Sequence, residues 1–242
     1  MAVALVLAMR VDVFRFGRGA GEAVQEYDVD ARSGMTVLDA LVEIQRNQDP
    51  TLAFRYACRV GMCGSCALVI NGRERWACRT LLASLRGKTV TLRPLYHFPL
   101  VCDLVVDMKP FVDKMRAVAG QFVPQETSST PNTSAPARSE RPAAIDDAIE
   151  CIGCGSCLSA CTMVGHDVRF AGPAALNRAF TLQADARDAG VAQRWSAILS
   201  EDALSRCHGQ ANCTEVCPMG LSPTQSILQL RRLAVRALMG RP

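Results

Sequence analysis

The first 110 residues alternate between apolar and polar positions in short runs. Strands are predicted at residues 9–16, 24–29, 68–70, 73–76 and 90–92. The pair Asn71-Gly72 separates two of these runs and favours a tight hairpin turn. Between the second and third runs, Thr36-x-x-Asp39 opens a stretch with helical periodicity that ends near Asp49-Pro50. The pattern predicts a small mixed sheet packed on one helix.

The periodicity becomes helical in the second half. Helices are predicted at residues 174–184, 191–199 and 223–239. The last has Ser222 as its cap and Pro223 at its first position. A segment rich in Pro, Ser and Thr, residues 124–142, separates the halves and is predicted to be a mobile linker. We therefore expect an α+β protein with domains at 1–123 and 143–242.

Size and composition limit the number of domains and the classes of function that the chain can have. The 242 residues fit two domains of ordinary size. A net charge of +4 and an aromatic content of 5% argue against a nucleic-acid partner. Residues 1–9 are apolar, but the run lacks a basic start and is far shorter than the ~18 residues of a membrane span. We expect it to extend the first strand or to reflect a mis-assigned start codon.

The 12 cysteines carry the chemistry, and their grouping favours metal binding over disulfides. Cys58-x4-Cys63-x2-Cys66, followed by Cys78, is the plant-type [2Fe–2S] spacing. The order of elements, with cysteines in the loop after the helix, is similar to a plant-ferredoxin-like β-grasp. Zinc is the main rival, because paired cysteines also serve tetrahedral zinc sites.

A second set of cysteines has the bacterial-ferredoxin pattern, in which the fourth cysteine of one run serves the other cluster. The first run is Cys151-x2-Cys154-x2-Cys157-x3-Cys161, and the partner run ends at Cys217-Pro218. The spacing assigns a [4Fe–4S] cluster to Cys151, Cys154, Cys157 and Cys217. We therefore predict an all-α, bacterial-ferredoxin-like second domain.

The partner run lacks one cysteine. The spacing calls for cysteines at 207, 210, 213 and 217, and position 210 is Gln210. The remaining site then receives Cys161, Cys207 and Cys213, which suits a [3Fe–4S] cluster. The alternative is a labile fourth iron held by water or by Gln210. Cys102 is left over and is expected to act as a small buried hydrophobe.

One two-iron site followed by a linked four-iron and three-iron pair resembles the succinate dehydrogenase and fumarate reductase iron–sulfur subunit family. Short sequence segments agree with this resemblance, including Gly172-Pro173-Ala174 and Cys207-His208. The resemblance implies an electron-transfer subunit that works with a flavoprotein subunit, membrane anchor subunits and quinone. It also implies a location on the cytoplasmic face of a prokaryotic inner membrane, peripheral through the partner subunits.

The resemblance gives His208 a role near quinone, because the family uses this position there. Arg231, Arg232 and Arg236 on the last helix are expected to face an anchor subunit or water. The sequence contains no flavin or nicotinamide fingerprint, so two-electron chemistry is expected on the partner. The alternatives are the iron–sulfur subunit of another quinone-linked or soluble dehydrogenase and, from another class, a structural zinc protein.

Overall fold

The computed structural model describes residues 7–17, 21–125 and 143–239, which fold into two compact units. The first unit takes the described residues up to Met108 together with Ile152–Ala160. The second takes the described parts of Lys109–Cys151 and of the chain from Cys161 onward. Apart from positions 124 and 125, the predicted linker lies outside the described residues.

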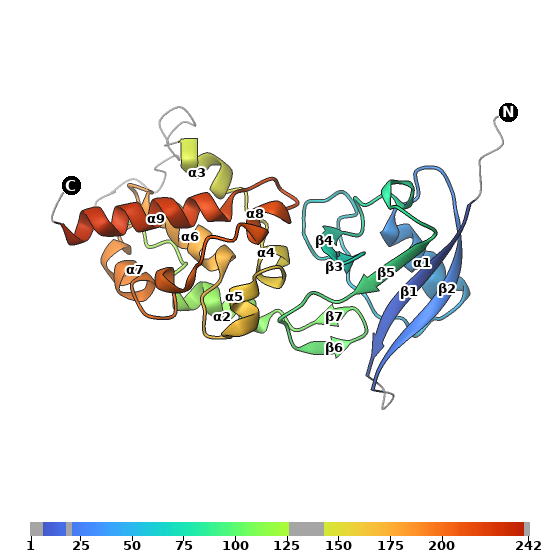
Figure 1. Cartoon of the computed structure of the whole chain (residues 1–242). Coiled ribbons are helices and arrows are strands. Elements are labelled where there is room, and N and C mark those ends of the chain that lie inside the picture. The colour runs from blue at the N-terminus through green and yellow to red at the C-terminus, as the bar shows by residue number, and fades with distance from the viewer. Residues whose placement is uncertain (1–6, 18–20, 126–142, 240–242) are drawn as a thin grey trace. The chain divides into compact units, whose positions relative to one another are not determined.

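A mixed five-stranded sheet forms the body of the first unit (Figure 1). Its strands are β1 (Leu7–Phe16), β2 (Glu22–Ala31), β3 (Ala67–Ile70), β4 (Arg73–Trp76) and β5 (Thr89–Arg93). The order across the sheet is β2-β1-β5-β3-β4. Strand β1 runs antiparallel to β2 and parallel to β5, so the chain crosses over between them. The predicted β-grasp with one packed helix is confirmed.

The helix of this unit, α1 (Val37–Asn47), begins where the sequence predicts. Thr36 Oγ1 accepts a hydrogen bond from the Asp39 backbone N–H at 3.2 Å, and Asp39 accepts one from the Thr36 N–H at 3.0 Å. This reciprocal capping box satisfies two donors that the first turn leaves without partners. The buried face of α1 contributes Leu38, Leu41 and Ile44 to the core.

The tight hairpin between β3 and β4 also follows the prediction. Asn71 and Gly72 both have positive φ angles, 49° and 75°, which a two-residue hairpin turn of this kind requires. The turn is further held because Asn71 Oδ1 accepts a hydrogen bond from the Thr91 N–H at 2.7 Å. The hairpin therefore sets the register between the ends of β3 and β4.

Helix α2 (Lys109–Ala117) belongs to the second unit, whereas the sequence analysis assigns residues up to 123 to the first domain. Its Lys114 Nζ donates hydrogen bonds of 2.5 Å to the carbonyls of Val168 and Phe170. The sequence pattern also missed this helix and the small β6–β7 ribbon before it, Leu100–Cys102 and Val105–Val106.

The second unit is helical, as predicted (Figure 1). Its remaining helices are α3 (Ala143–Ala148), α5 (Thr162–His166), α6 (Pro173–Gln183), α7 (Val191–Ile198), α8 (Asn212–Glu215) and α9 (Pro223–Leu238), with a 3-10 turn at Leu204–Arg206. The long α6 and α9 pack side by side, and Ser226 Oγ donates to Asn177 Oδ1 between them at 2.7 Å. Within the described residues, no helix is both long and apolar enough to span a bilayer.

One short helix belongs to a different unit from the one that the sequence predicts. The predicted second domain includes α4 (Ser156–Ser159), but this helix packs within the first unit. Ser159 Oγ donates to the buried Glu74 carboxylate at 2.7 Å and accepts from the Tyr96 N–H at 2.9 Å. The bond to Glu74 joins a segment that carries predicted cluster ligands to the edge strand β4, and the bond from Tyr96 joins it to the loop after β5.

Candidate functional site

The first cysteine group lies in the loop between α1 and β3 and just after β4. The β3–β4 hairpin brings Cys78 back beside Cys66, because the Ala77 N–H donates to the Cys66 carbonyl at 3.0 Å. The backbone N–H groups of Met62 and Cys63 both donate to Cys58 Sγ at 3.3 Å. The fold thus gathers into one place all four cysteines that the sequence predicts as [2Fe–2S] ligands.

Two glycines allow this loop to fold tightly. Gly61 has φ +77°, and a Cβ there would lie 2.9 Å from Arg79 Cγ and 3.0 Å from the Trp76 ring. Gly64 has φ +70°, and its Cβ would lie 2.6 Å from Cys154 Cβ. Side chains are excluded at both positions by conformation and by space. The loop backbone can therefore fold closely around its cysteines.

The thiols of this group are chemically unequal. The Ser65 hydroxyl, with the other hydrogen bonds in the loop, lowers the pKa of Cys63 to about 6. Burial, by contrast, raises the pKa of Cys66 to about 12. Iron binds thiolates, so a cluster replaces protons at the buried positions. A group of four thiols, two of them buried and two half-buried, with backbone N–H donors fits the sulfur-rich environment of a two-iron cluster.

The predicted three-iron ligands line one hollow in the second unit. Cys161, Cys207 and Cys213 all face it, together with His208 and Gln210, and it encloses about 370 Å³ including space open to solvent. Burial raises the pKa values of the Cys161 and Cys213 thiols. The hollow thus offers three sulfur donors in a partly buried setting, which fits a cluster that needs three thiolates.

Gln210 lies where a fourth cysteine would stand. Its Oε1 accepts a hydrogen bond from the Thr162 hydroxyl, so the next residue after Cys161 holds the amide in place. The side chain is exposed and lines the same hollow. An amide binds iron poorly compared with a thiolate. The arrangement fits the prediction that this corner lacks a protein thiolate.

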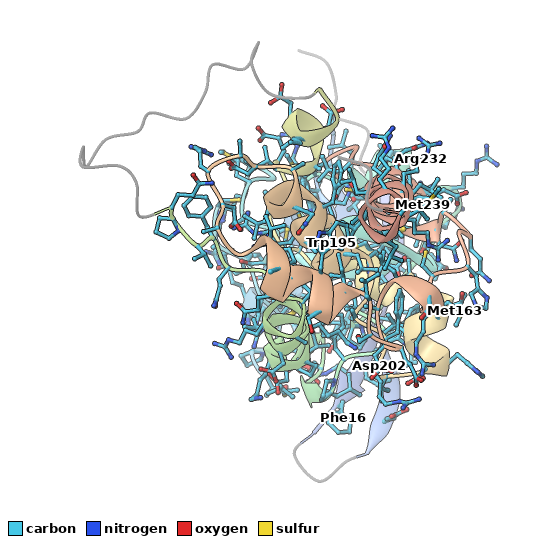
Figure 2. The ribbon with its side chains drawn as sticks, turned by 90° about the vertical axis from the view of Figure 1, so that its left-hand side faces the viewer. Phe16, Met163, Trp195, Asp202, Arg232 and Met239 are labelled. Atoms are coloured by element: carbon cyan, nitrogen blue, oxygen red, sulfur yellow. The ribbon has the colours of Figure 1, made fainter. Side chains whose placement is uncertain are left out.

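Helix α9 supports the loop that carries Cys207. Arg231 donates to the carbonyls of Leu204 at 2.6 Å and Cys207 at 2.5 Å. Part of the Arg231 guanidinium is thus engaged with carbonyls of its own unit, and the expectation that this residue faces a partner or water stays a prediction. Arg232, in contrast, is exposed and points away from the helical unit (Figure 2).

The predicted four-iron ligands are distributed over both units. Cys154 and Cys157 belong to the first, and Cys151 and Cys217 to the second. Cys154 Sγ lies 3.5 Å from Ser156 Oγ, and Cys151 is exposed. Their assignment to one cluster stays a prediction.

Within the parts of the chain that the structure describes, no group of three or more His, Cys, Asp or Glu side chains converges closely enough to hold a single metal ion. A cluster differs from such a site because its thiolates bind different irons. Cys102, outside every predicted set, is only half-buried, on β6, and not fully buried as expected.

Comparison with known proteins bears directly on this arrangement. Residues 10–113 match the model of the 2Fe-2S iron-sulfur cluster binding domain, and residues 147–221 match that of the 4Fe-4S dicluster domain. The succinate dehydrogenase iron-sulfur subunit of Paracoccus denitrificans is 35% identical over 93% of this chain and 88% of that protein. The chain belongs to the succinate dehydrogenase and fumarate reductase iron–sulfur subunit family.

Further relatives come from both branches of the family. The fumarate reductase iron-sulfur subunit of Haemophilus influenzae is 30% identical, with 91% of each chain covered. Among solved structures, a chain of the Mycobacterium smegmatis Sdh1 complex in the apo form superposes with a TM-score of 0.87 at 29% identity, covering 96% of this chain and 98% of that one. The agreement in fold extends over both units.

This iron–sulfur subunit is thus an electron-transfer component of an oxidoreductase complex and works with partner subunits. Its cofactors are iron–sulfur clusters of the two-iron and four-iron domain types, and a three-iron cluster is consistent with the family. The zinc alternative is not supported.

Sequence reasoning missed several residues that shape the site. Ser65, Thr162 and Arg231 act through hydrogen bonds to or beside the cysteines. Ser65 and Thr162 each adjoin a predicted ligand in the sequence, and this adjacency is a signal that a search for polar neighbours would find. Arg231 is far from Cys207 in the chain, so only the fold reveals its role.

Proposed function

We propose that the cysteines other than Cys102 divide into three ligand sets. Cys58, Cys63, Cys66 and Cys78 hold [2Fe–2S]; Cys151, Cys154, Cys157 and Cys217 hold [4Fe–4S]; Cys161, Cys207 and Cys213 hold [3Fe–4S]. Through them the subunit passes single electrons between a flavoprotein partner and quinone. The observation that carries this proposal is the hollow in which three cysteines meet Gln210 in place of a fourth.

The close approach of two cysteine-bearing segments supports a continuous relay. Gly64 lies between Cys63 and Ser65 in the first cysteine loop, and its missing side chain leaves room for Cys154 within the same unit. The bond from Ser159 to Glu74 fixes the Cys154 segment in this position. A ligand of the four-iron cluster thereby lies directly against the loop of the two-iron cluster.

When bound, the clusters supply centres that accept and release one electron at a time. The work of the chain is to hold them, to bury them and to direct N–H and hydroxyl donors at the sulfurs, as Met62 and Cys63 do for Cys58. The dicarboxylate is converted on the flavoprotein. Quinone binds at membrane anchor subunits, with His208 at the rim of the three-iron hollow close to it. The subunit then lies on the cytoplasmic face of the membrane, attached through those partners.

Serine variants of single cysteines test the ligand sets in the purified complex. We expect Cys63→Ser to change the EPR signal of the reduced two-iron cluster and Cys161→Ser to remove the oxidised three-iron signal. Cys102→Ser is the matched control and should leave all signals as in the wild type. Loss of a cluster signal in the control, or an intact three-iron signal in Cys161→Ser, would contradict the assignment.

A second experiment tests the flavoprotein partner. The isolated chain should not reduce a dye with succinate, and addition of the flavoprotein should restore this reaction. The reason is that the sequence has no flavin-binding fingerprint. Succinate-dependent dye reduction by the pure single chain would contradict the proposal.

A further inference from the structure

A lysine lies beside the three-iron hollow, on an element that the ligand sets do not use. Lys114 extends from α2, and its Nζ donates hydrogen bonds of 2.5 Å to the carbonyls of Val168 and Phe170. Phe170 is 1% exposed and lines the hollow beside Cys161 and Cys207. The ammonium group is therefore hydrogen-bonded to the backbone of a residue that lines the hollow.

The charge of this lysine reaches one of the predicted ligands, because Lys114 and Cys161 contribute to each other's electrostatic environment. Burial lowers the pKa of Lys114, and the charges of Asp167, Asp202 and Cys161 oppose this fall. Lys114 and Cys161 therefore interact electrostatically.

The neighbouring carboxylates Asp167 and Asp202 act on Lys114 without forming a salt bridge to it. Asp167 pairs with Arg169 at 3.0 Å and also with Arg206, and Asp202 pairs with Arg206 at 3.2 Å. Lys114 forms no ion pair within the described residues, and its contacts there are backbone carbonyls. Its positive charge is thus not cancelled by a direct salt bridge among these residues.

We propose that Lys114 is an electrostatic positioning residue that raises the reduction potential of the three-iron cluster. This inference rests on the proposed assignment of that cluster to Cys161, Cys207 and Cys213. Uptake of one electron from the preceding cluster makes the site more negative by one charge. A fixed cation nearby stabilises the reduced form more than the oxidised form. The cation thereby favours the arrival of an electron at this end of the relay.

The test is a potentiometric titration followed by EPR of the oxidised three-iron signal in the assembled complex. We expect Lys114→Met and Lys114→Gln to lower the midpoint potential and Lys114→Arg to keep it near the wild-type value. The midpoint of the two-iron cluster should stay unchanged in all variants and serves as the internal control. Lys114→Gln matters most, because the amide keeps a hydrogen-bond donor but loses the charge.

Two results would overturn the inference. One is a wild-type midpoint in Lys114→Met, and the other is a wild-type midpoint in Lys114→Gln, since hydrogen bonding rather than charge would then explain the role of the lysine. If Lys114→Met does not assemble, the comparison of Lys114→Gln with Lys114→Arg decides the question in the same way. Absence of a three-iron signal in the wild type would instead contradict the proposed function itself.

Discussion

The Thr162 hydroxyl donates a hydrogen bond to Oε1 of Gln210, and this contact ties the residue after one predicted ligand to the corner that lacks a ligand. The amide is therefore directed toward a hydroxyl group of the protein. A cysteine at this position would instead present a thiol to the same hollow. The identity of residue 210 thus decides whether the site offers three sulfur donors or four.

We predict that Gln210→Cys converts the three-iron cluster to [4Fe–4S], because it supplies the missing thiolate. The added negative charge should also make the cluster harder to reduce and slow electron transfer to quinone. EPR of the oxidised protein checks the conversion, since an oxidised three-iron cluster is paramagnetic and [4Fe–4S]²⁺ is silent. Gln210→Ala is the control and should keep the signal, because it removes the amide without adding a thiolate. Retention of the signal in Gln210→Cys would contradict the assignment of this corner.

Gly64→Ala should disturb both cysteine segments of the first unit. The new Cβ would lie 2.6 Å from Cys154 Cβ, and the φ of +70° adds a cost of roughly 1–2 kcal/mol for a residue with a side chain. Gly72→Ala is a matched control, because Gly72 has φ +75° and nothing lies within 4 Å of its Cβ position. We expect loss of four-iron and two-iron signal intensity in Gly64→Ala only. Equal loss in both variants would show that the backbone angle, and not the contact with Cys154, limits assembly.

Ser159→Ala should destabilise the first unit. Glu74 is 6% exposed, and removal of its hydrogen-bond partner leaves a buried carboxylate, at a cost of about 1–3 kcal/mol. Replacing both groups, as in Ser159→Ala with Glu74→Met, should recover part of this loss, because the buried carboxylate is removed and only the Tyr96 N–H loses its acceptor. Thermal unfolding followed by loss of the visible cluster absorption measures both effects. Equal stability of Ser159→Ala and the wild type would show that the bond does not anchor α4.

This same bond shows where sequence reasoning stops. The spacing of Cys154 and Cys157 predicts their chemistry, because cluster ligation depends on local spacing. The spacing does not predict that the segment of Cys154 and Cys157 belongs to the first unit. That placement depends on the bond between Ser159 and Glu74, which are 85 residues apart in the chain. The five strands of the main sheet, α1 and α9 were predictable from periodicity and caps, whereas α2 depends on the contacts of Lys114 with Val168 and Phe170.

The first unit should become less stable at low pH, because Asp49 is then protonated. Partial burial opposes ionisation, but hydrogen bonds from Thr51, Arg15 and Tyr27 hold the pKa of Asp49 well below its usual range. A depressed pKa in the folded state contributes stability above the unfolded value, about pH 4, and this contribution is lost as the pH falls further. The difference in unfolding free energy between the wild type and Asp49→Asn should therefore shrink from pH 7 to pH 3. Asp30→Asn, which makes the same change at an exposed position of β2, is the matched control.

The most direct test of the relay follows the clusters during turnover. Succinate is added anaerobically to the oxidised, purified complex, and the sample is frozen for EPR. The account predicts that the oxidised three-iron signal disappears while the signal of the reduced two-iron cluster appears. In Gln210→Cys, the three-iron signal should be absent before succinate is added. A wild-type complex in which the flavin is reduced while both cluster signals stay unchanged would contradict the account.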